Sequence, residues 1–163
     1  MNGNMSMVAA TAVALLAGLI SGAWIAFRAV SPKYRKAKSE STKHFRMFTL
    51  MNQWVKIKQD GKNLAEYLDK KNYKKIAIYG MNFIGERLLS ELKDSDITVS
   101  YAIDKNAKNL FSYVDLITPD EKLEEVDAIV VTAIAYFDEI EEMLMDKGVK
   151  CPILSVEDLM YEL

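Results

Sequence analysis

A glycine turn from Gly80 to Gly85 is the stretch of this 163-residue sequence whose residue types and spacing point to ligand chemistry. It follows an apolar run, KKIAIYG, and leads into an amphipathic run, FIGERLLSEL, so a strand turns into a helix there. Backbone N–H groups at such a helix start can hold a phosphate without any side chain. The nucleotide-binding pattern G-x-G-x-x-G has a middle glycine, and Asn82 stands in its place. Asn82 tolerates a left-handed backbone, but its side chain takes space beside a pyrophosphate.

An acidic residue, Asp104, ends the next apolar run, ITVSYAID, nineteen residues after Gly85. This matches the acidic residue about 20 positions on that accepts ribose hydroxyls in dinucleotide-binding folds. The turn and Asp104 together predict a nucleotide site. Its candidate residues are Gly80, Met81, Asn82, Phe83, Ile84, Gly85, Asp104, Lys105 and Thr132. The alternative is a domain that has lost its ligand and serves as a scaffold, because fold alone does not imply function.

No set of catalytic residues accompanies this turn in the sequence. His44 is the only histidine and Cys151 the only cysteine, which excludes a Cys/His zinc cluster and an intramolecular disulfide. Two Tyr-x-x-x-Lys pairs, at Tyr34 and Tyr67, precede the turn, whereas dehydrogenase chemistry needs such a pair after it. We therefore predict no catalytic residue and no metal. The cofactor stays open between NAD, a nucleotide sugar and none.

Five apolar runs, separated mostly by amphipathic ones, predict the elements that position the turn. These runs are residues 74–80, 97–104, 114–118, 127–134 and 152–156. Strands that alternate with helices form a parallel sheet with right-handed crossovers. We therefore predict an α/β fold, a small doubly wound parallel sheet of Rossmann-like order 3-2-1-4-5. Its ligand crevice would lie between the ends of strand one, at Gly80, and strand four, near Thr132. Thr118 to Glu121, TPDE, has the pattern of a helix start, so a short helix is expected after it.

A segment without charge or proline, Val8 to Phe27, has the ~20 residues that a helix needs to cross a bilayer. A buried soluble helix would carry a polar stripe, and a signal peptide would have a basic start, so we interpret the segment as an uncleaved transmembrane helix. Basic residues follow it and none precedes it. The positive-inside rule then predicts a single pass through the inner membrane, with the N-terminus outside and the soluble domain in the cytoplasm. Gly18 and Gly22, flanked by Ala14 and Ala26, form one face suited to homo-oligomer contacts.

A basic helical lead-in connects this anchor to the α/β domain. We expect Ser31-Pro32 to end the first helix and a polar, basic linker to follow. Phe45, Phe48, Met51 or Asn52, and Val55 lie at helical spacing beyond it, with Trp54 nearby. Such a helix could lie in the membrane interface, dock on the following domain or dock on a second subunit, and interrupting polar residues favour docking. The predicted boundaries are 1–30 for the anchor, 31–73 for the linker and amphipathic helices, and 74–163 for the Rossmann-like domain.

Charge is distributed unevenly along the chain. Residues 31–60 carry eight basic and two acidic side chains, and residues 61–163 carry twelve basic and twenty-one acidic ones. A basic collar beside a membrane is attracted to anionic headgroups. The acidic remainder argues against a nucleic-acid partner, because a phosphate backbone demands a basic surface.

The runs KKIAIYGMNFIGERLLSEL, SYAIDKNA, DAIVVTAIAYFDEIEEML and CPILSVEDL carry a family resemblance. They resemble small Rossmann-like modules of bacterial surface-polysaccharide and nucleotide-sugar pathways. These include stand-alone nucleoside-diphosphate-sugar epimerase-like modules and the N-terminal domain of sugar acyltransferases. The resemblance implies that Gly80, Gly85 and Asp104 hold a nucleotide, and that glycan-biosynthesis enzymes (capsule or exopolysaccharide) are partners. The expected function is a membrane-anchored nucleotide- or nucleotide-sugar-binding module. A NAD-dependent epimerase or dehydrogenase, complete only as an oligomer, and a ligand-free scaffold are the alternatives.

Overall fold

The computed structural model describes the backbone of residues 2–163. Among the first 29 residues it describes the side chains at positions 7, 13, 15, 18–22, 24, 25, 27 and 28. In chain order the elements are α1 (Asn2–Gln59), α2 (Leu64–Lys70), β1 (Lys75–Tyr79), α3 (Phe83–Leu92), β2 (Thr98–Ile103), η1 (Ala107–Asn109), β3 (Asp115–Ile117), β4 (Ala128–Val131), η2 (Ile134–Tyr136), α4 (Phe137–Asp146), β5 (Ile153–Ser155) and α5 (Val156–Glu162). They form two compact units, residues 1–45 and residues 46–163.

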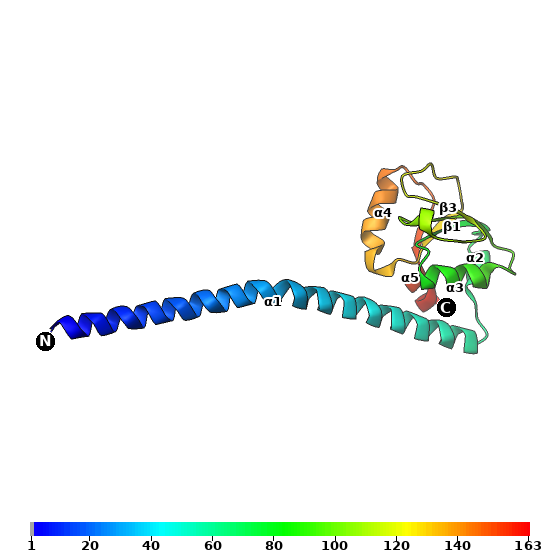
Figure 1. Cartoon of the computed structure of the whole chain (residues 1–163). Helices are drawn as coiled ribbons and strands as arrows, with labels where there is room; N and C mark the ends of the chain where they lie inside the picture. Colours follow the sequence, from blue (N-terminus) through cyan, green and yellow to red (C-terminus); the bar gives the residue numbers. More distant parts are fainter. Residues whose placement is uncertain (1) are drawn as a thin grey trace. The chain divides into compact units, whose positions relative to one another are not determined.

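Helix α1 runs without a break through Pro32 (Figure 1). The expectation that Ser31-Pro32 ends the first helix and that a linker follows is therefore wrong. Proline removes one backbone N–H and disfavours a helix interior by about 3 kcal/mol. The residues after it, YRKAKSESTKHFRMF, are mostly moderate to good helix formers, and the last turns of α1 belong to the second unit and pack in its core. Helical propensity and packing together outweigh one lost hydrogen bond.

The predicted membrane anchor, Val8 to Phe27, falls partly on side chains outside the described residues, as do Ala14 and Ala26 of its small-residue face. Within the part of the chain that the structure describes, no helix is both long enough and apolar enough to cross a membrane. A Cβ added at Gly18 or Gly22 would meet no atom within 4 Å.

The second unit is built on a five-stranded parallel sheet in the order β3-β2-β1-β4-β5. The predicted α/β class, parallel sheet and strand order are confirmed. Strand order reverses between β1 and β4, where Tyr79 pairs with Val131. Every residue of β4 and all but the first residue of β1 are buried, as expected for central parallel strands covered on both faces.

Helices cover both faces of this sheet (Figure 1). On one face, Ile76 and Ile78 of β1 pack with residues of α2, α3, α5 and the last turns of α1. On the other face, Ala77 and Tyr79 pack with Ile140 of α4 and with neighbouring strands. The alternation along β1 therefore sends Tyr79 to the face that α4 covers.

The last turns of α1 dock on the sheet unit through a stripe that the sequence analysis did not choose. Leu50, Trp54 and Ile57, spaced four and three apart, are buried in the core. Phe45 and Phe48, at 69% exposure each, lie outside it. Docking on the domain, one of the three alternatives, is thus observed for these turns, but through a different face. The predicted stripe followed the helical spacing of Phe45, Phe48 and Val55, whereas the buried stripe lies on another side of the helix.

The expected helix after Thr118 does not form, although Thr118 and Glu121 contact each other. Glu121 accepts hydrogen bonds from the Thr118 N–H and hydroxyl, at 2.7 and 2.9 Å. Residues 118–127 must cross from β3 past β2 and β1 to β4, which is about 14 Å at ~4.8 Å per strand. Over the same length they must also return from the carboxyl-terminal ends of the strands to the amino-terminal end of β4. Ten helical residues would span only about 15 Å. An extended path is therefore needed, and the capping motif closes only a turn.

Candidate functional site

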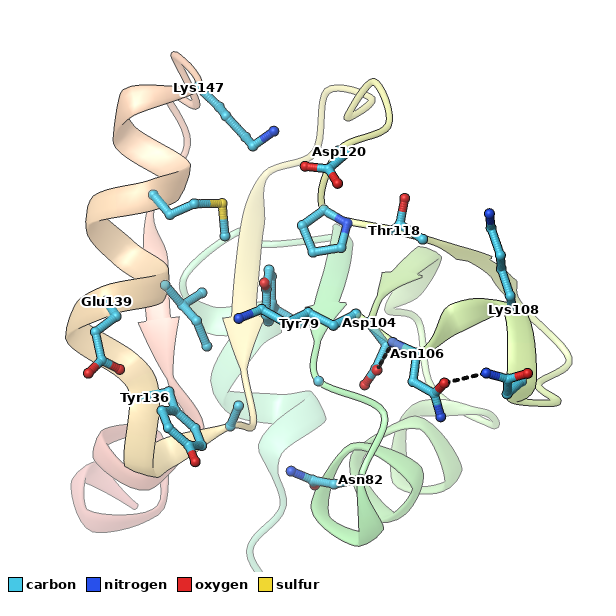
Figure 2. A pocket seen from close by; sticks show the side chains of 17 residues that line it. Tyr79, Asn82, Asp104, Asn106, Lys108, Thr118, Asp120, Tyr136, Glu139 and Lys147 are labelled. Atoms are coloured by element: carbon cyan, nitrogen blue, oxygen red, sulfur yellow. Dashed lines mark hydrogen bonds between the residues drawn. The ribbon is translucent and has the colours of Figure 1, made fainter.

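A cavity of about 960 Å³ opens beyond the carboxyl-terminal ends of β1, β2 and β3 and is bordered on its other side by α4 (Figure 2). Tyr79 and Gly80 line its floor. One wall comes from the loop after β2 and from the residues after β3, and the opposite wall comes from α4. Ligands of open α/β sheets bind in this region, outside the carboxyl ends of the strands where strand order reverses. The fold thus places the cavity where the sequence predicted a crevice.

The glycine turn is a tightly packed corner beside this cavity. Gly80 has a φ of +98°, a left-handed conformation that favours glycine. A Cβ at Gly85 would overlap the carbonyl oxygen of Gly80, so α3 can approach the strand end only with glycine there. Beneath the turn, the fully buried Thr132 hydroxyl donates to the Gly80 carbonyl. These contacts make both glycines and Thr132 necessary for the shape of the corner.

Asn82 is the N-cap of α3. Its side-chain oxygen accepts hydrogen bonds from the N–H groups of Ile84, at 2.8 Å, and Gly85, at 3.2 Å. The Asn82 carbonyl also accepts the Glu86 N–H, at 2.9 Å. Several amides that could face a phosphate are therefore already bonded within the protein. Asparagine is among the strongest N-cap residues, which explains the choice of side chain in structural terms.

Asp104 joins the glycine turn to the loop after β2. One carboxylate oxygen accepts the Met81 N–H at 2.8 Å, and the other accepts the Asn106 N–H at 2.7 Å. A carboxylate offers about four lone-pair positions, so each oxygen can still accept one more hydrogen bond. Asp104 therefore holds the site together and remains able to accept hydrogen bonds from a ligand.

Charged and apolar groups share the walls of the cavity. Lys105 and Lys108 lie on the β2 side and Lys147 directly after α4, and Figure 2 shows Lys108 and Lys147 on opposite sides of the opening. The acidic groups besides Asp104 are Asp120 and Glu139. Apolar surface comes from Pro119, Ile140 and Met143, and aromatic surface from Tyr136. Such a mixture suits a ligand with both ionic and apolar parts.

Tyr79 is the most unusual group in the cavity. Its side chain is 3% exposed, and its hydroxyl has no hydrogen-bond partner within the described chain. Burial, followed by the charges of Asp104 and Asp120, raises the pKa of Tyr79. The phenol therefore stays protonated at neutral pH and can donate a hydrogen bond.

The structure brings together only part of the predicted site. Gly80, Asn82, Asp104 and Lys105 line the cavity. The other five predicted residues lie around it: Met81 and Ile84 in the core, Gly85 and Thr132 buried under the turn, and Phe83 at 73% exposure on the surface.

The cavity residues that the sequence analysis missed belong to four segments. Tyr79 ends β1, and Asn106, Lys108 and Asn109 lie in the loop after β2. Thr118 to Asp120 follow β3, and the fourth segment, which runs from the end of β4 to just after α4, lines the cavity at positions 133, 136, 139, 140, 143 and 147. A signal existed for the first three segments, because residues at the carboxyl ends of parallel strands share one edge of the sheet. Positions 136, 139, 140, 143 and 147 have the spacing of one helix face. Within the described residues, no group of three or more His, Cys, Asp or Glu side chains could hold a metal ion.

Comparison with family models gives one match, which covers just under half of the chain. Residues 72–152 match the model described as C2185-like, N-terminal. The matched segment contains β1 to β4, α3, α4 and all of the cavity residues. Comparisons with curated proteins and with solved structures give no significant match.

Proposed function

We propose that the α/β unit binds a nucleotide or nucleotide sugar in the cavity at the carboxyl-terminal edge of its sheet. The observation that carries this proposal is the combination of a 960 Å³ cavity at the point of strand reversal with Asp104 on its rim. Asp104 would accept hydroxyl groups of a ribose through the lone pairs that its two backbone contacts leave free.

The phosphates of such a ligand would lie against the lysines of the cavity rather than deep in the α3 N-terminus. Asn82 already occupies the Ile84 and Gly85 amides. Lys105 and Lys108 lie on the same wall as Asp104, so a diphosphate that extends from a ribose would meet positive charge there.

A second candidate function, a ligand-free scaffold, is favoured by this same Asn82 contact. A helix start that is capped by its own side chain needs no anion to satisfy its N–H groups. The two candidates make opposite statements about ligand binding, so one measurement separates them.

We further propose that the chain is anchored in the inner membrane beside glycan-biosynthesis enzymes and acts there as a homo-oligomer. The support comes from the uncharged segment from Val8 to Phe27, the basic residues that follow it and the Gly18/Gly22 face. The resemblance to modules of surface-polysaccharide pathways supports the choice of partner.

A thermal-shift screen of residues 43–163 tests ligand binding. NAD, UDP-sugars and other nucleotides would be added at millimolar concentration. A ligand that binds only the native state at 100 times its Kd adds about 2.7 kcal/mol of stability, which raises the unfolding midpoint by several degrees. Asp104→Asn should weaken a ribonucleotide at least tenfold, because it replaces a charged acceptor. If no nucleotide raises the midpoint of the wild-type domain, the scaffold candidate stands and the binding proposal fails.

A further inference from the structure

The unpaired hydroxyl of Tyr79 is an observation that the proposed function does not use. Tyr79 ends β1 on the sheet face that α4 covers, and its ring packs between the strands and α4. The side chain is more than nine-tenths buried, lines the cavity, and has no hydrogen-bond partner for its hydroxyl within the described chain. A buried polar group without a partner is unfavourable, so a phenylalanine would serve the core better unless the hydroxyl meets a ligand.

The surroundings of this hydroxyl decide which kind of ligand atom suits it. Asp104 and Asp120 are the charged groups that most affect Tyr79, and both raise the pKa of its phenol. Figure 2 shows Tyr79 beside Asp104, with Asp120 above it. A phosphate placed here would bring its negative charge beside two carboxylates, which is unfavourable. The atom that Tyr79 meets should therefore be an acceptor on a neutral group.

A hydroxyl group fits both requirements. It can accept a hydrogen bond from Tyr79 and donate its own proton to a carboxylate. Asp104 has one free position on each oxygen, because each already accepts one backbone N–H. A ring with neighbouring hydroxyls could thus bond to Tyr79 and Asp104 together, with Asp120 as a second acceptor nearby.

We propose that the cavity binds a sugar ring through neighbouring hydroxyl groups, with the Tyr79 hydroxyl donating to the oxygen of one of these hydroxyls and the Asp104 carboxylate accepting from them. The inference rests on the proposed nucleotide or nucleotide-sugar function and names the part of the ligand that the cavity floor recognises. The shared chemistry is a vicinal diol, which either the ribose or the attached hexose supplies. Tyr79 is a specificity-determining residue in this arrangement.

Calorimetric titration of the full chain in detergent tests the inference with Tyr79→Phe. This variant keeps the ring and removes only the hydroxyl. The probes are UDP-glucose, UDP, the 2′,3′-dideoxy form of UDP, NAD and inorganic diphosphate. The matched control is Tyr101→Phe. Tyr101 lies on β2 on the same sheet face, is equally buried, and donates to the Glu124 carbonyl at 2.8 Å outside this cavity.

The expected result is a loss of about tenfold in affinity for diol-bearing ligands in Tyr79→Phe, with no loss of stability. Affinity for inorganic diphosphate should be unchanged. If Tyr79→Phe binds UDP more weakly but binds the dideoxy form as the wild type does, the ring that Tyr79 recognises is the ribose. If the affinity falls for UDP-glucose alone, that ring is the hexose. Tyr101→Phe should lose stability, because its hydrogen bond is lost, and should bind every probe as the wild type does.

Three results would overturn the inference. Equal affinities of wild type and Tyr79→Phe for every probe that binds would remove Tyr79 from the site and leave the proposed function intact. A loss for inorganic diphosphate as large as that for UDP-glucose would make Tyr79 a phosphate contact. If no probe binds the wild type, the proposed function fails, and this inference falls with it.

Discussion

At the scale of single residues, the site is governed by side chains that bond to backbone N–H groups. Asn82 caps α3, and Asp104 fastens the glycine turn to the loop after β2. Both stand at positions where nucleotide-binding folds contact their ligand. The same atoms therefore stabilise the corner itself and, in the proposed function, would compete with or contribute to ligand binding.

Asn82→Gly tests this competition. Glycine is a fair N-cap, so the free energy of unfolding should fall by only a few tenths of a kcal/mol. The Ile84 and Gly85 N–H groups lose their partner and become available to an anion. We expect tighter binding of ADP by calorimetry. Asn82→Asp is the matched control, because it keeps the cap but adds negative charge and should weaken ADP. If Asn82→Gly binds ADP no more tightly, these amides are not the phosphate site.

The second prediction at this scale concerns how the stability of the fold depends on pH through Tyr101 of β2. Burial, followed by the charges of Cys151 and Glu124, raises the pKa of Tyr101 from 10.0 to about 12. Between these values the unfolded chain loses a proton that the native chain keeps, so stability is complete below pH 10 and falls as pH rises toward 12. The difference in unfolding free energy between wild type and Tyr101→Phe should therefore shrink across this window in urea titrations. A difference that stays constant would contradict the prediction, and effects of other groups, such as Tyr67, cancel in the comparison.

At the scale of elements, Glu91 of α3 fastens the end of α1 to the sheet unit. Its carboxylate accepts the indole N–H of Trp54 at 2.6 Å and the Leu64 N–H at 2.9 Å, and it pairs with Lys58 at 2.8 Å. The Glu91 side chain is only 6% exposed in that ion pair. One residue thus joins α1, the start of α2 and α3.

Glu91→Ala should lower the free energy of unfolding of residues 43–163 by about 2–3 kcal/mol, because two buried donors lose a charged acceptor. Glu91→Gln keeps one acceptor and should have a smaller effect. Arg87→Ala, on an exposed position of the same helix, is the control and should change stability by less than about 0.5 kcal/mol. Urea titration measures all three. A Glu91→Ala effect no larger than the control would show that packing of Leu50 and Ile57 alone holds α1.

Elements were easier to predict than contacts between them. The apolar runs determined the five strands, and their alternation with helices determined the sheet order, because parallel strands and right-handed crossovers leave few alternatives. Three local patterns gave wrong predictions. Pro32 did not end α1, the TPDE motif closed a turn without a helix, and the buried stripe of α1 was Leu50, Trp54 and Ile57. In each case packing or the length of a crossing segment outweighed local propensity.

The part of the candidate site that was predicted is the part that sequence spacing marks. Gly80, Asn82 and Asp104 follow a spaced pattern and line the cavity. Tyr79 and the α4 residues have no such pattern, since their importance depends on which helix covers the sheet face and on how the extended segment after β3 runs. A buried hydroxyl without a partner becomes visible only when its neighbours are placed.

At the scale of the whole molecule, charge and apolar content divide the chain. The uncharged segment comes first, the basic residues follow, and the acidic α/β unit comes last. A basic segment beside a membrane is held near anionic headgroups at about 1 kcal/mol per charge, whereas an acidic unit is repelled from them. The proposed anchor would therefore tether the α/β unit to the membrane, while the negative charge of this unit would keep it from binding to the headgroups.

Topology is tested by reporters fused to the C-terminus of the full chain. A phosphatase that is active only in the periplasm should be inactive, and a fluorescent protein that folds only in the cytoplasm should fluoresce, because five basic residues follow the segment from Val8 to Phe27 within about a dozen positions. These residues are Arg28, Lys33, Arg35, Lys36 and Lys38. The control variant replaces them with glutamine and places lysines ahead of Val8, which should reverse both readouts. An active phosphatase on the unmodified chain, or a variant that leaves both readouts unchanged, would contradict the proposed orientation, since the charge difference across the segment is its only determinant.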